Sequence, residues 1–209
     1  MEPASVVYFV DDDPGMRAAI QRLLTLSKVA VEVYASGAEF LDAARFDRPG
    51  CIVLDVSMPQ MSGLEVQAAL KQRDVALPVV FLTGSSDIPI AVTAMREGAI
   101  DFIEKPFQNE DFVARIRAAI ARHLRVRHAD SERAAVRSHI DKLTPREHQI
   151  MELVVTGKTS KEIARAIGSS HRTVEIHRAR LMEKMGAKTL AELVRLRMQV
   201  VDGASEDTT

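Results

Sequence analysis

The sequence predicts two folded units, an α/β domain built on a doubly wound parallel sheet and a smaller all-α domain, joined by a helical linker. In the first part of the chain, five short apolar runs alternate with amphipathic segments. After residue 143 the pattern changes to short helices with clear start and stop signals. Residues 1–124 carry 12 Lys and Arg against 17 Asp and Glu (net −5), whereas residues 125–209 carry 16 against 12 (net +4). A basic second half suggests that this domain faces a polyanion.

The overall composition is that of a folded soluble protein, with 46% apolar and 27% charged residues. Cys51 is the single cysteine, which excludes an internal disulfide and a cysteine-based metal cluster. No run approaches the roughly 18 apolar residues that cross a bilayer, so we expect a cytoplasmic protein without membrane contact. The expected parts are an α/β domain at 1–122, a linker helix at 123–142, a helical domain at 143–201 and a disordered tail at 202–209.

Each predicted strand is a short apolar run that ends at a loop or helix signal. The run from Cys51 to Leu54 is unbroken, as in a strand buried on both faces, and Ser62 with Glu65 then forms a capping box that opens a helix. The other helix starts carry a capping residue or an early proline, at Asp13, Ser36, Pro89 and Asn109. The predicted strands cover residues 6–10, 31–34, 51–54, 79–82 and 101–104.

Polar residues stand where four of these strands end: Asp11 and Asp12, Asp55, Thr83 and Lys105. In a right-handed doubly wound sheet these ends converge on one edge. Several carboxylates this close repel one another unless a divalent cation lies among them, and hard oxygen ligands favour Mg²⁺ or Mn²⁺. The hydroxyl and the ammonium would then hold the oxygens of a phosphoryl group. Asp55 alone would be interpreted as an ordinary loop acid, but the whole set predicts a phosphoryl-transfer site.

Four motifs resemble the receiver domain of two-component response regulators over residues 5–122: VDDD (10–13), VLDVSMPQMSG (53–63), LTG (82–84) and EKPF (104–107). The resemblance implies the flavodoxin-like strand order 2-1-3-4-5. It also implies that Asp55 accepts a phosphoryl group from a phosphohistidine of a sensor histidine kinase. Asp12 and Asp55 would bind Mg²⁺ directly, Asp11 would bind it through water, and the Ser57 carbonyl would complete the shell.

The same resemblance implies a switch. Thr83 and Lys105 would turn towards the phosphoryl oxygens, and the Lys105–Pro106 bond is often cis in this family. Phe102 stands at the aromatic switch position, where Tyr is better known, and plain core packing is the alternative interpretation of this residue. Ordering of the loops around phosphorylated Asp55 would bias the face made by the fourth helix, fifth strand and fifth helix, where we expect a dimer contact.

The second half shows a helix-turn-helix. Capping residues open its helices at Thr144, Thr159, Ser170 and Thr189. Two short helices joined by the tight turn 168–170 form a motif whose second helix lies in a DNA major groove. Residues 143–196 resemble the LuxR/NarL-type DNA-binding domain, and the full chain resembles the FixJ branch of NarL-type response regulators.

A helical wheel of residues 170–185 puts a core face opposite an exposed face. The predicted core face consists of Val174, His177, Leu181 and Met185. By the resemblance, the base edges are met by Glu175, Ile176 and Ala179, and phosphates by Lys158, Lys161, Arg172, Thr173, Arg180 and Lys184. Glu175 can accept from cytosine N4, although an intrahelical pair with Arg172 or a neighbouring arginine is the alternative. The resemblance also implies that the apolar stripe of the last helix is a dimer surface, formed by Leu190, Leu193 and Val194.

The linker is predicted to be helical because neither Gly nor Pro occurs between Pro106 and Pro145. Its histidines, His123, His128 and His139, are not at metal-ligand spacing, and we expect them to be solvated. A heptad seam runs through Val126, Ala129, Arg133, Val136, Ile140 and Leu143. Two interpretations stay open: the seam pairs with a second chain once phosphorylated receivers associate, or the helix lies on its own receiver or DNA-binding domain.

These features predict a transcription factor of a two-component system that is switched by phosphorylation and is not an enzyme. The expected partners are a sensor histidine kinase, double-stranded promoter DNA, RNA polymerase and a second copy of the phosphorylated chain. A small phosphoryl-transfer enzyme would need a catalytic acid or base, and the sequence offers no spare candidate near Asp55. A DNA-binding protein with an inert receiver is disfavoured because all five strand-end residues are present.

Overall fold

The computed structural model describes residues 5–84 and 88–201. Two compact units divide the chain between Val126 and Arg127. No helix in the described part is long and apolar enough to cross a membrane. The first unit contains β1 Val6–Val10, α1 Pro14–Leu26, β2 Ala30–Tyr34, α2 Gly37–Ala43, β3 Gly50–Asp55, α3 Gly63–Gln72, β4 Val79–Thr83, α4 Ile88–Arg96, β5 Asp101–Glu104 and the start of α5 Asn109–Ile140.

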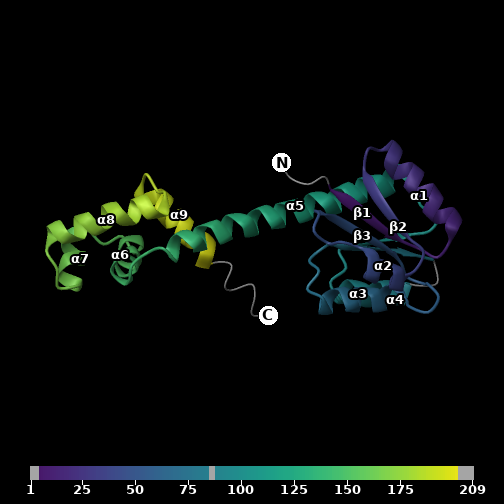
Figure 1. Cartoon of the computed structure of the whole chain (residues 1–209), viewed down its shortest axis with the longest axis horizontal. Helices are drawn as coiled ribbons and strands as arrows, with labels where there is room; N and C mark the ends of the chain where they lie inside the picture. The colour runs from purple at the N-terminus through teal and green to yellow at the C-terminus, as the bar shows by residue number, and fades with distance from the viewer. Residues whose placement is uncertain (1–4, 85–87, 202–209) are drawn as a thin grey trace. The chain divides into compact units, whose positions relative to one another are not determined.

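The described sheet is parallel and has the order β2-β1-β3-β4-β5, as predicted. Strands β1, β3 and β4 are buried along their whole length, because helices cover both faces of the sheet (Figure 1). Side chains of successive residues point to opposite faces, so Tyr8 belongs to one core and Phe9 to the other. Ile20 of α1 and Ile116 of α5 pack on the Phe9 side, whereas residues of α2 and α3 pack on the Tyr8 side.

Local signals place most element boundaries within one residue of the prediction. The Ser62–Glu65 capping box opens α3, and the side chain of Asp13 accepts from the Gly15 N–H at the start of α1. Asn109 differs: it is the first residue of α5 rather than the residue that caps it. Asp55 and Thr83 are the last residues of their strands, so rigid sheet backbone holds both side chains.

Helix α5 continues to Ile140, which confirms the predicted helical linker. The expectation that His123 is solvated is wrong. Its side chain is buried, and Nδ1 lies 2.9 Å from the Gly50 carbonyl oxygen and 3.3 Å from the Gly50 nitrogen. The reason is helical spacing, because His123 follows Ile116 and Ala119 on the side of α5 that faces the sheet. His128 is exposed, as expected.

The second unit packs the end of α5 with α6 Pro145–Val155, α7 Ser160–Ala166, α8 His171–Met185 and α9 Leu190–Val201. Capping boxes open α6 at Thr144 and α7 at Thr159, and Ser170 caps α8. The core of this unit contains residues from all five helices, namely Val136, Ile150, Met151, Ile163, Val174, Leu181, Met185 and Leu193.

The end of the predicted linker helix contributes to this core. Val136 of α5 is 5% exposed within the second unit, and Ile140 and Leu143 pack against the same core. Val126, at the start of the heptad seam, is 53% exposed. Of the two interpretations of the seam, the structure supports for its second half the one in which the helix lies on its own helix-turn-helix unit.

Candidate functional site

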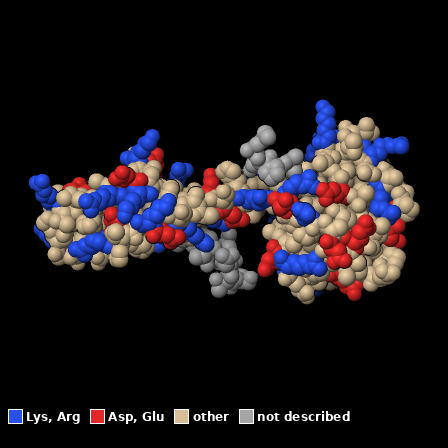
Figure 2. All heavy atoms as spheres, viewed as in Figure 1, with Lys and Arg blue, Asp and Glu red and all other residues tan. Residues whose placement is uncertain are grey.

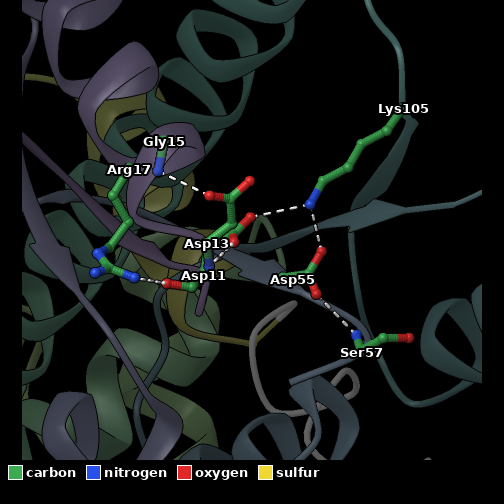
Figure 3. Close-up of polar contacts among 7 residues, drawn as sticks. All are labelled: Asp11, Asp13, Gly15, Arg17, Asp55, Ser57 and Lys105. Carbon is green, nitrogen blue, oxygen red and sulfur yellow. Dashed lines mark hydrogen bonds and ion pairs between the residues drawn. The ribbon is translucent and has the colours of Figure 1, made fainter. Parts of the chain in front are cut away.

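Asp55 and Asp11 meet at one ammonium group at the carboxyl edge of the sheet (Figure 3). Lys105 Nζ donates to Asp55 Oδ1 at 2.6 Å and to Asp11 Oδ2 at 2.9 Å. The Ser57 N–H donates to the other Asp55 oxygen at 3.0 Å. Three residues predicted from separate strand ends therefore converge, because the parallel sheet brings the ends of β1, β3 and β5 to one edge.

Burial and hydrogen bonding together set the pKa values in this cluster. Asp11 is 1% exposed, and desolvation raises the pKa of its carboxyl group even though Lys105 acts in the opposite direction. Burial lowers the pKa of Lys105, but its hydrogen bonds to Asp55 and Asp11 outweigh that effect and the net pKa is raised. Lys105 therefore stays cationic at neutral pH and offsets two carboxylates.

The third predicted acid lies apart from this contact. Asp12 is exposed, and no three His, Cys, Asp or Glu side chains among the described residues stand close enough together to hold a metal ion. Asp13 caps α1, accepting from Gly15 N at 2.7 Å. The donor set nevertheless fits a hard divalent cation, because Asp11 and Asp55 supply converging carboxylates at a buried site that favours added positive charge.

Thr83 and Phe102 lie on the two strands that follow β3 in the sheet. Thr83 is buried at the end of β4, and its hydroxyl donates to the Gly84 carbonyl at 3.0 Å. Phe102 is 42% exposed, so its interpretation as a plain core residue is wrong. Strand β5 is the sheet edge, where Ile103 faces the core and Phe102 the opposite side. The Lys105–Pro106 bond is cis.

Two supporting residues were not predicted. Gly63 opens α3 so close to Asp55 that an added Cβ would lie 2.3 Å from the Asp55 carbonyl oxygen. The glycine directly after the Ser62 cap is the sequence signal for this close approach. Arg17, in α1, donates from Nη1 to the main-chain carbonyl of Asp11 at 2.7 Å (Figure 3). Sequence spacing alone does not reveal this contact, because the side chain folds back along the helix.

Helix α8 carries a second candidate site, a nucleic-acid interface. Val174, Leu181 and Met185 are buried as predicted, whereas His177 is half-buried. The other side of the helix carries the residues expected at base edges and at phosphates, which are all exposed: Arg172, Thr173, Glu175, Ile176, Ala179 and Arg180. Lys158 and Lys161 are exposed at the start of α7. In Figure 2, Lys and Arg side chains gather over the unit that contains α6–α9.

Two expectations about α8 need correction. Lys184 is not free for phosphate, because its ammonium donates to Glu147 Oε2 at 2.7 Å and to the Lys142 carbonyl at 3.0 Å. Glu147 is buried, so this ion pair joins the end of α8 to the start of α6. Glu175 Oε1 lies 3.9 Å from His171 Nε2, so the side-chain contact that the structure shows for Glu175 is with a histidine, an ion pair only when the imidazole is protonated, rather than with an arginine.

The dimer stripe predicted on α9 also needs correction, because one of its three residues faces the core of the domain instead of the surface. Leu193 is 0% exposed and belongs to the core of its own unit, so it is not a surface residue. Leu190 is 44% exposed, Val194 is half-buried and Met198 is exposed. These three residues follow one another at intervals of four, so the outward stripe runs through Leu190, Val194 and Met198.

The comparisons with known proteins match a family to each of the two units. The response regulator receiver domain family matches residues 7–117, and the bacterial regulatory proteins of the luxR family match residues 141–197. The transcriptional regulatory protein FixJ of Azorhizobium caulinodans is 42% identical over 204 residues, 97% of this chain and 96% of that protein. The transcriptional regulatory protein TdiR of Thauera aromatica is 37% identical over 196 residues, 94% of this chain and 86% of that protein.

Solved structures are similar over nearly the same length. The response regulator StyR matches with a TM-score of 0.85 and 34% identity, covering 94% of this chain and 100% of that chain. Full-length FixJ from B. japonicum matches with a TM-score of 0.60 and 37% identity, covering 94% and 97%. The chain therefore belongs to the FixJ-type response regulators of two-component systems, which join a receiver domain to a LuxR-type helix-turn-helix domain.

Proposed function

We propose that this response regulator is activated when Asp55 accepts a phosphoryl group from a sensor histidine kinase, and that activation leads to dimerisation and promoter binding. The observation that carries the proposal is the pair of contacts on Asp55, from the Lys105 ammonium at 2.6 Å and from the Ser57 N–H at 3.0 Å. They hold the carboxylate at the carboxyl end of a central strand.

The chemistry follows from charge. The P–N bond of a phosphohistidine breaks and a P–O bond to an Asp55 oxygen forms, so two negatively charged groups must approach each other. Lys105 reduces this repulsion, and its second hydrogen bond, to Asp11, keeps the ammonium beside the reacting carboxylate. Thr83 lies on the neighbouring strand and would donate to a phosphoryl oxygen once its hydroxyl rotates away from Gly84.

The residues proposed to hold Mg²⁺, or Mn²⁺, are Asp11, Asp12, Asp55 and the carbonyl of Ser57. When bound, the ion supplies positive charge that offsets the charge on the phosphoryl oxygens. Asp11 and Asp55 are already directed to one point by Lys105, and Asp12 would join them by rotation of its exposed side chain. The chain acts as a phosphoacceptor and not as an enzyme that turns over a separate substrate.

A groove beside Lys105 suits the kinase. It has a volume of about 610 Å³ and runs between α1 and the loop that follows β5. Its lining is mostly apolar, with Ile20, Leu23, Pro106 and Phe107 among the residues. A kinase must bring its phosphohistidine to Asp55, and this groove is an apolar surface that continues directly from the reacting residues. We therefore propose that the kinase docks here.

The proposed switch and dimer surfaces are apolar and exposed. Val92 and Met95 of α4 and Phe102 of β5 are exposed large hydrophobic residues in the receiver. Their exposure supports a dimer contact on the face made by α4, β5 and α5, with Thr83 and Phe102 as switch residues. In the helix-turn-helix domain, the proposed dimer stripe is Leu190, Val194 and the added Met198.

The proposed DNA interface keeps most of the predicted residues. Glu175, Ile176 and Ala179 would meet base edges, and the phosphate contacts would come from Lys158, Lys161, Arg172, Thr173 and Arg180. Lys184 is removed from this set because of its ion pair with Glu147. RNA polymerase remains a proposed partner of the complex at the promoter, and the cytoplasm its proposed location.

Phosphate uptake tests the acceptor role. The full chain is incubated with acetyl phosphate and MgCl₂, and the modified residue is located by mass spectrometry. We expect phosphate on Asp55 in the wild type, none in Asp55→Asn, and none when EDTA removes divalent cations. Asp42→Asn, which neutralises an exposed acid on α2, serves as the matched control and should be labelled like the wild type. Equal labelling of Asp55→Asn would refute the assignment.

A further inference from the structure

Arg17 contacts the turn that carries Asp11 and Asp12, two of the acids proposed to hold the cation. Its Nη1 donates to the Asp11 carbonyl oxygen at 2.7 Å (Figure 3). Its own main-chain N–H donates to the carbonyl of Asp13, the residue that caps α1. The half-buried side chain therefore folds back over the turn between β1 and α1. A charge-assisted hydrogen bond of this length is stronger than one between neutral groups.

The contact orients a particular peptide group. The Asp11 carbonyl and the Asp12 nitrogen belong to one planar unit, so fixing the oxygen also fixes the direction in which the chain enters Asp12. Other contacts in the turn hold its neighbours: Asp13 N–H bonds to Asp11 Oδ1 at 2.8 Å, and Gly15 N–H bonds to Asp13 Oδ1 at 2.7 Å. The contact from Arg17 thus orients the backbone from which the exposed Asp12 carboxylate extends.

We infer that Arg17 is a positioning residue for divalent-cation binding, acting through the Asp11–Asp12 peptide. The inference rests on the proposed function, in which Asp11, Asp12 and Asp55 hold the ion. Arg17 would not touch the ion or the phosphoryl group. Its role is to keep the two adjacent acids in an arrangement that a cation can use without reordering the turn.

Charge and positioning predict opposite effects, which makes the inference testable. Arg17 is itself positive, so deleting its charge near a cation site would by Coulomb's law tighten cation binding. Loss of positioning would weaken binding, because residues that orient metal ligands affect metal affinity about tenfold or more. The sign of the change in Mg²⁺ affinity therefore separates the two effects.

The experiment measures Mg²⁺ binding to the full, unphosphorylated chain by isothermal titration calorimetry. We expect Arg17→Ala to weaken Mg²⁺ binding, with a rise in Kd of about tenfold. Arg17→Lys, which keeps the charge and one donor, should recover part of this loss. The matched control is Arg22→Ala, which removes an exposed arginine from the same helix and should leave the Kd within about twofold of the wild type. Thermal unfolding of each variant shows whether the fold is retained.

An Arg17→Ala protein that binds Mg²⁺ as well as or better than the wild type would overturn the inference, whatever its melting temperature. If Arg17→Ala does not fold, Arg17→Gln takes its place, because it is neutral but keeps an amide donor. The glutamine side chain is shorter than arginine and is not expected to reach the Asp11 carbonyl as well. Weakened Mg²⁺ binding of Arg17→Gln would therefore support the inference, and tightened or unchanged binding would refute it.

A wild type that binds no Mg²⁺ would instead refute the proposed function together with the inference. If Asp55 is labelled normally and only the effect of Arg17 is missing, the inference alone fails.

Discussion

Lys105 donates to Asp55 across 2.6 Å and so joins two residues that lie 50 positions apart in the sequence. The contact connects the ends of β5 and β3, with β4 between them in the sheet. The same nitrogen also bonds to Asp11, so one cation serves two carboxylates that would otherwise repel each other. This arrangement makes Lys105 the centre of the receiver site.

Replacing Lys105 should slow phosphorylation strongly. Lys105→Ala removes the charge that offsets the approaching phosphoryl group and leaves the buried Asp11 without its cationic partner. We expect the rate of labelling by acetyl phosphate at saturating MgCl₂ to fall about 10²-fold. Lys71→Ala is the control, because Lys71 lies on α3 and forms an exposed ion pair with Glu97. Labelling of Lys105→Ala within about threefold of the wild type would contradict the role given to Lys105.

The buried Glu147 should make the helix-turn-helix domain sensitive to acid. Its pKa is lowered to about 2, first by the hydrogen bond from Lys184 and next by the backbone hydrogen bond from Thr144. Because the folded-state pKa lies below the usual 4.5, the stabilisation is complete above about pH 4.5 and is lost as the pH falls towards 2. Glu147→Gln should lower the stability of this domain at pH 7 by about 1–3 kcal/mol and reduce the loss of stability on acidification below about pH 4.5.

The measurement is amide hydrogen exchange of α6 in the full chain at several pH values. Glu162→Gln is a close control, since Glu162 completes the same kind of capping box at α7 but is exposed. It should have a smaller effect than Glu147→Gln. An unchanged pH dependence in Glu147→Gln would show that the ion pair with Lys184 does not stabilise the domain.

Two valines on α5 should differ sharply in their contribution to stability. Val136→Ala removes methyl groups from the core of the second unit and should destabilise that unit by about 1–2 kcal/mol. Val126→Ala makes the same substitution on the same helix at an exposed position, and should change stability by less than about 0.5 kcal/mol. The stability of both variants is measured by urea unfolding, with hydrogen exchange of the α8 amides as the signal. Equal effects would mean that α5 does not belong to this core.

The burial of Val136 also predicts the relative stability of two fragments. A fragment that begins at Leu143, where the sequence places the domain boundary, lacks Val136 and should be less stable than a fragment that begins at Arg127. Circular dichroism during thermal unfolding compares the two fragments. Identical melting temperatures would show that residues 127–142 do not add to the stability of this domain and would support the boundary predicted from the sequence.

Two basic residues of α8 should affect DNA binding in different ways. Arg180 is exposed, so Arg180→Ala should weaken binding to all sequences alike and reduce the slope of log K against log salt by about 1. Lys184→Ala should lower the stability of the domain through the loss of its pair with Glu147, while the salt slope stays as in the wild type. Fluorescence anisotropy over a salt series measures both slopes. The reverse pattern would return Lys184 to the phosphate contacts.

Base reading by Glu175 is separate from these phosphate contacts. Glu175→Ala should relax the preference at one base position by about 1–3 kcal/mol, because in the proposed interface the carboxylate accepts from a base edge. Selection from a random DNA library with each protein compares the two preferences. An unchanged consensus would assign Glu175 to its pair with His171 instead.

The parallel sheet and the receiver residues could be predicted because their signals are strong and local, whereas the strand order was implied by the resemblance to receiver domains. Strands buried on both faces are continuous apolar runs, and each functional residue stands directly at a strand end. Parallel topology then brings those ends together without further information. The capping boxes at Ser62, Thr144 and Thr159 are equally local signals, because the two residues of each box lie within four positions of each other.

The errors arise where a helix meets more than one neighbour. Periodicity shows that α9 has an apolar side, but Leu193 and Val194 are only about 100° apart around the helix, and tertiary packing decides which of them is buried. Likewise, the positive charge of Lys184 predicts a DNA contact. The sequence does not reveal that Lys184 pairs with Glu147 instead, because the two residues are 37 positions apart. The contact between His123 and Gly50 spans 73 positions. The spacing of residues along the chain does not predict such long-range pairs.

The central claim is that phosphorylation of Asp55 controls DNA binding, and the most direct test is the affinity of the full chain for promoter DNA with and without beryllofluoride, a phosphoryl mimic. The DNA is selected from a random library with the wild-type protein, and anisotropy is measured in MgCl₂ at fixed salt. We predict that beryllofluoride tightens binding of the wild type by about tenfold or more, as a typical coupling free energy would, and leaves Asp55→Asn unchanged. Equal tightening in Asp55→Asn, or none in the wild type, would contradict the account.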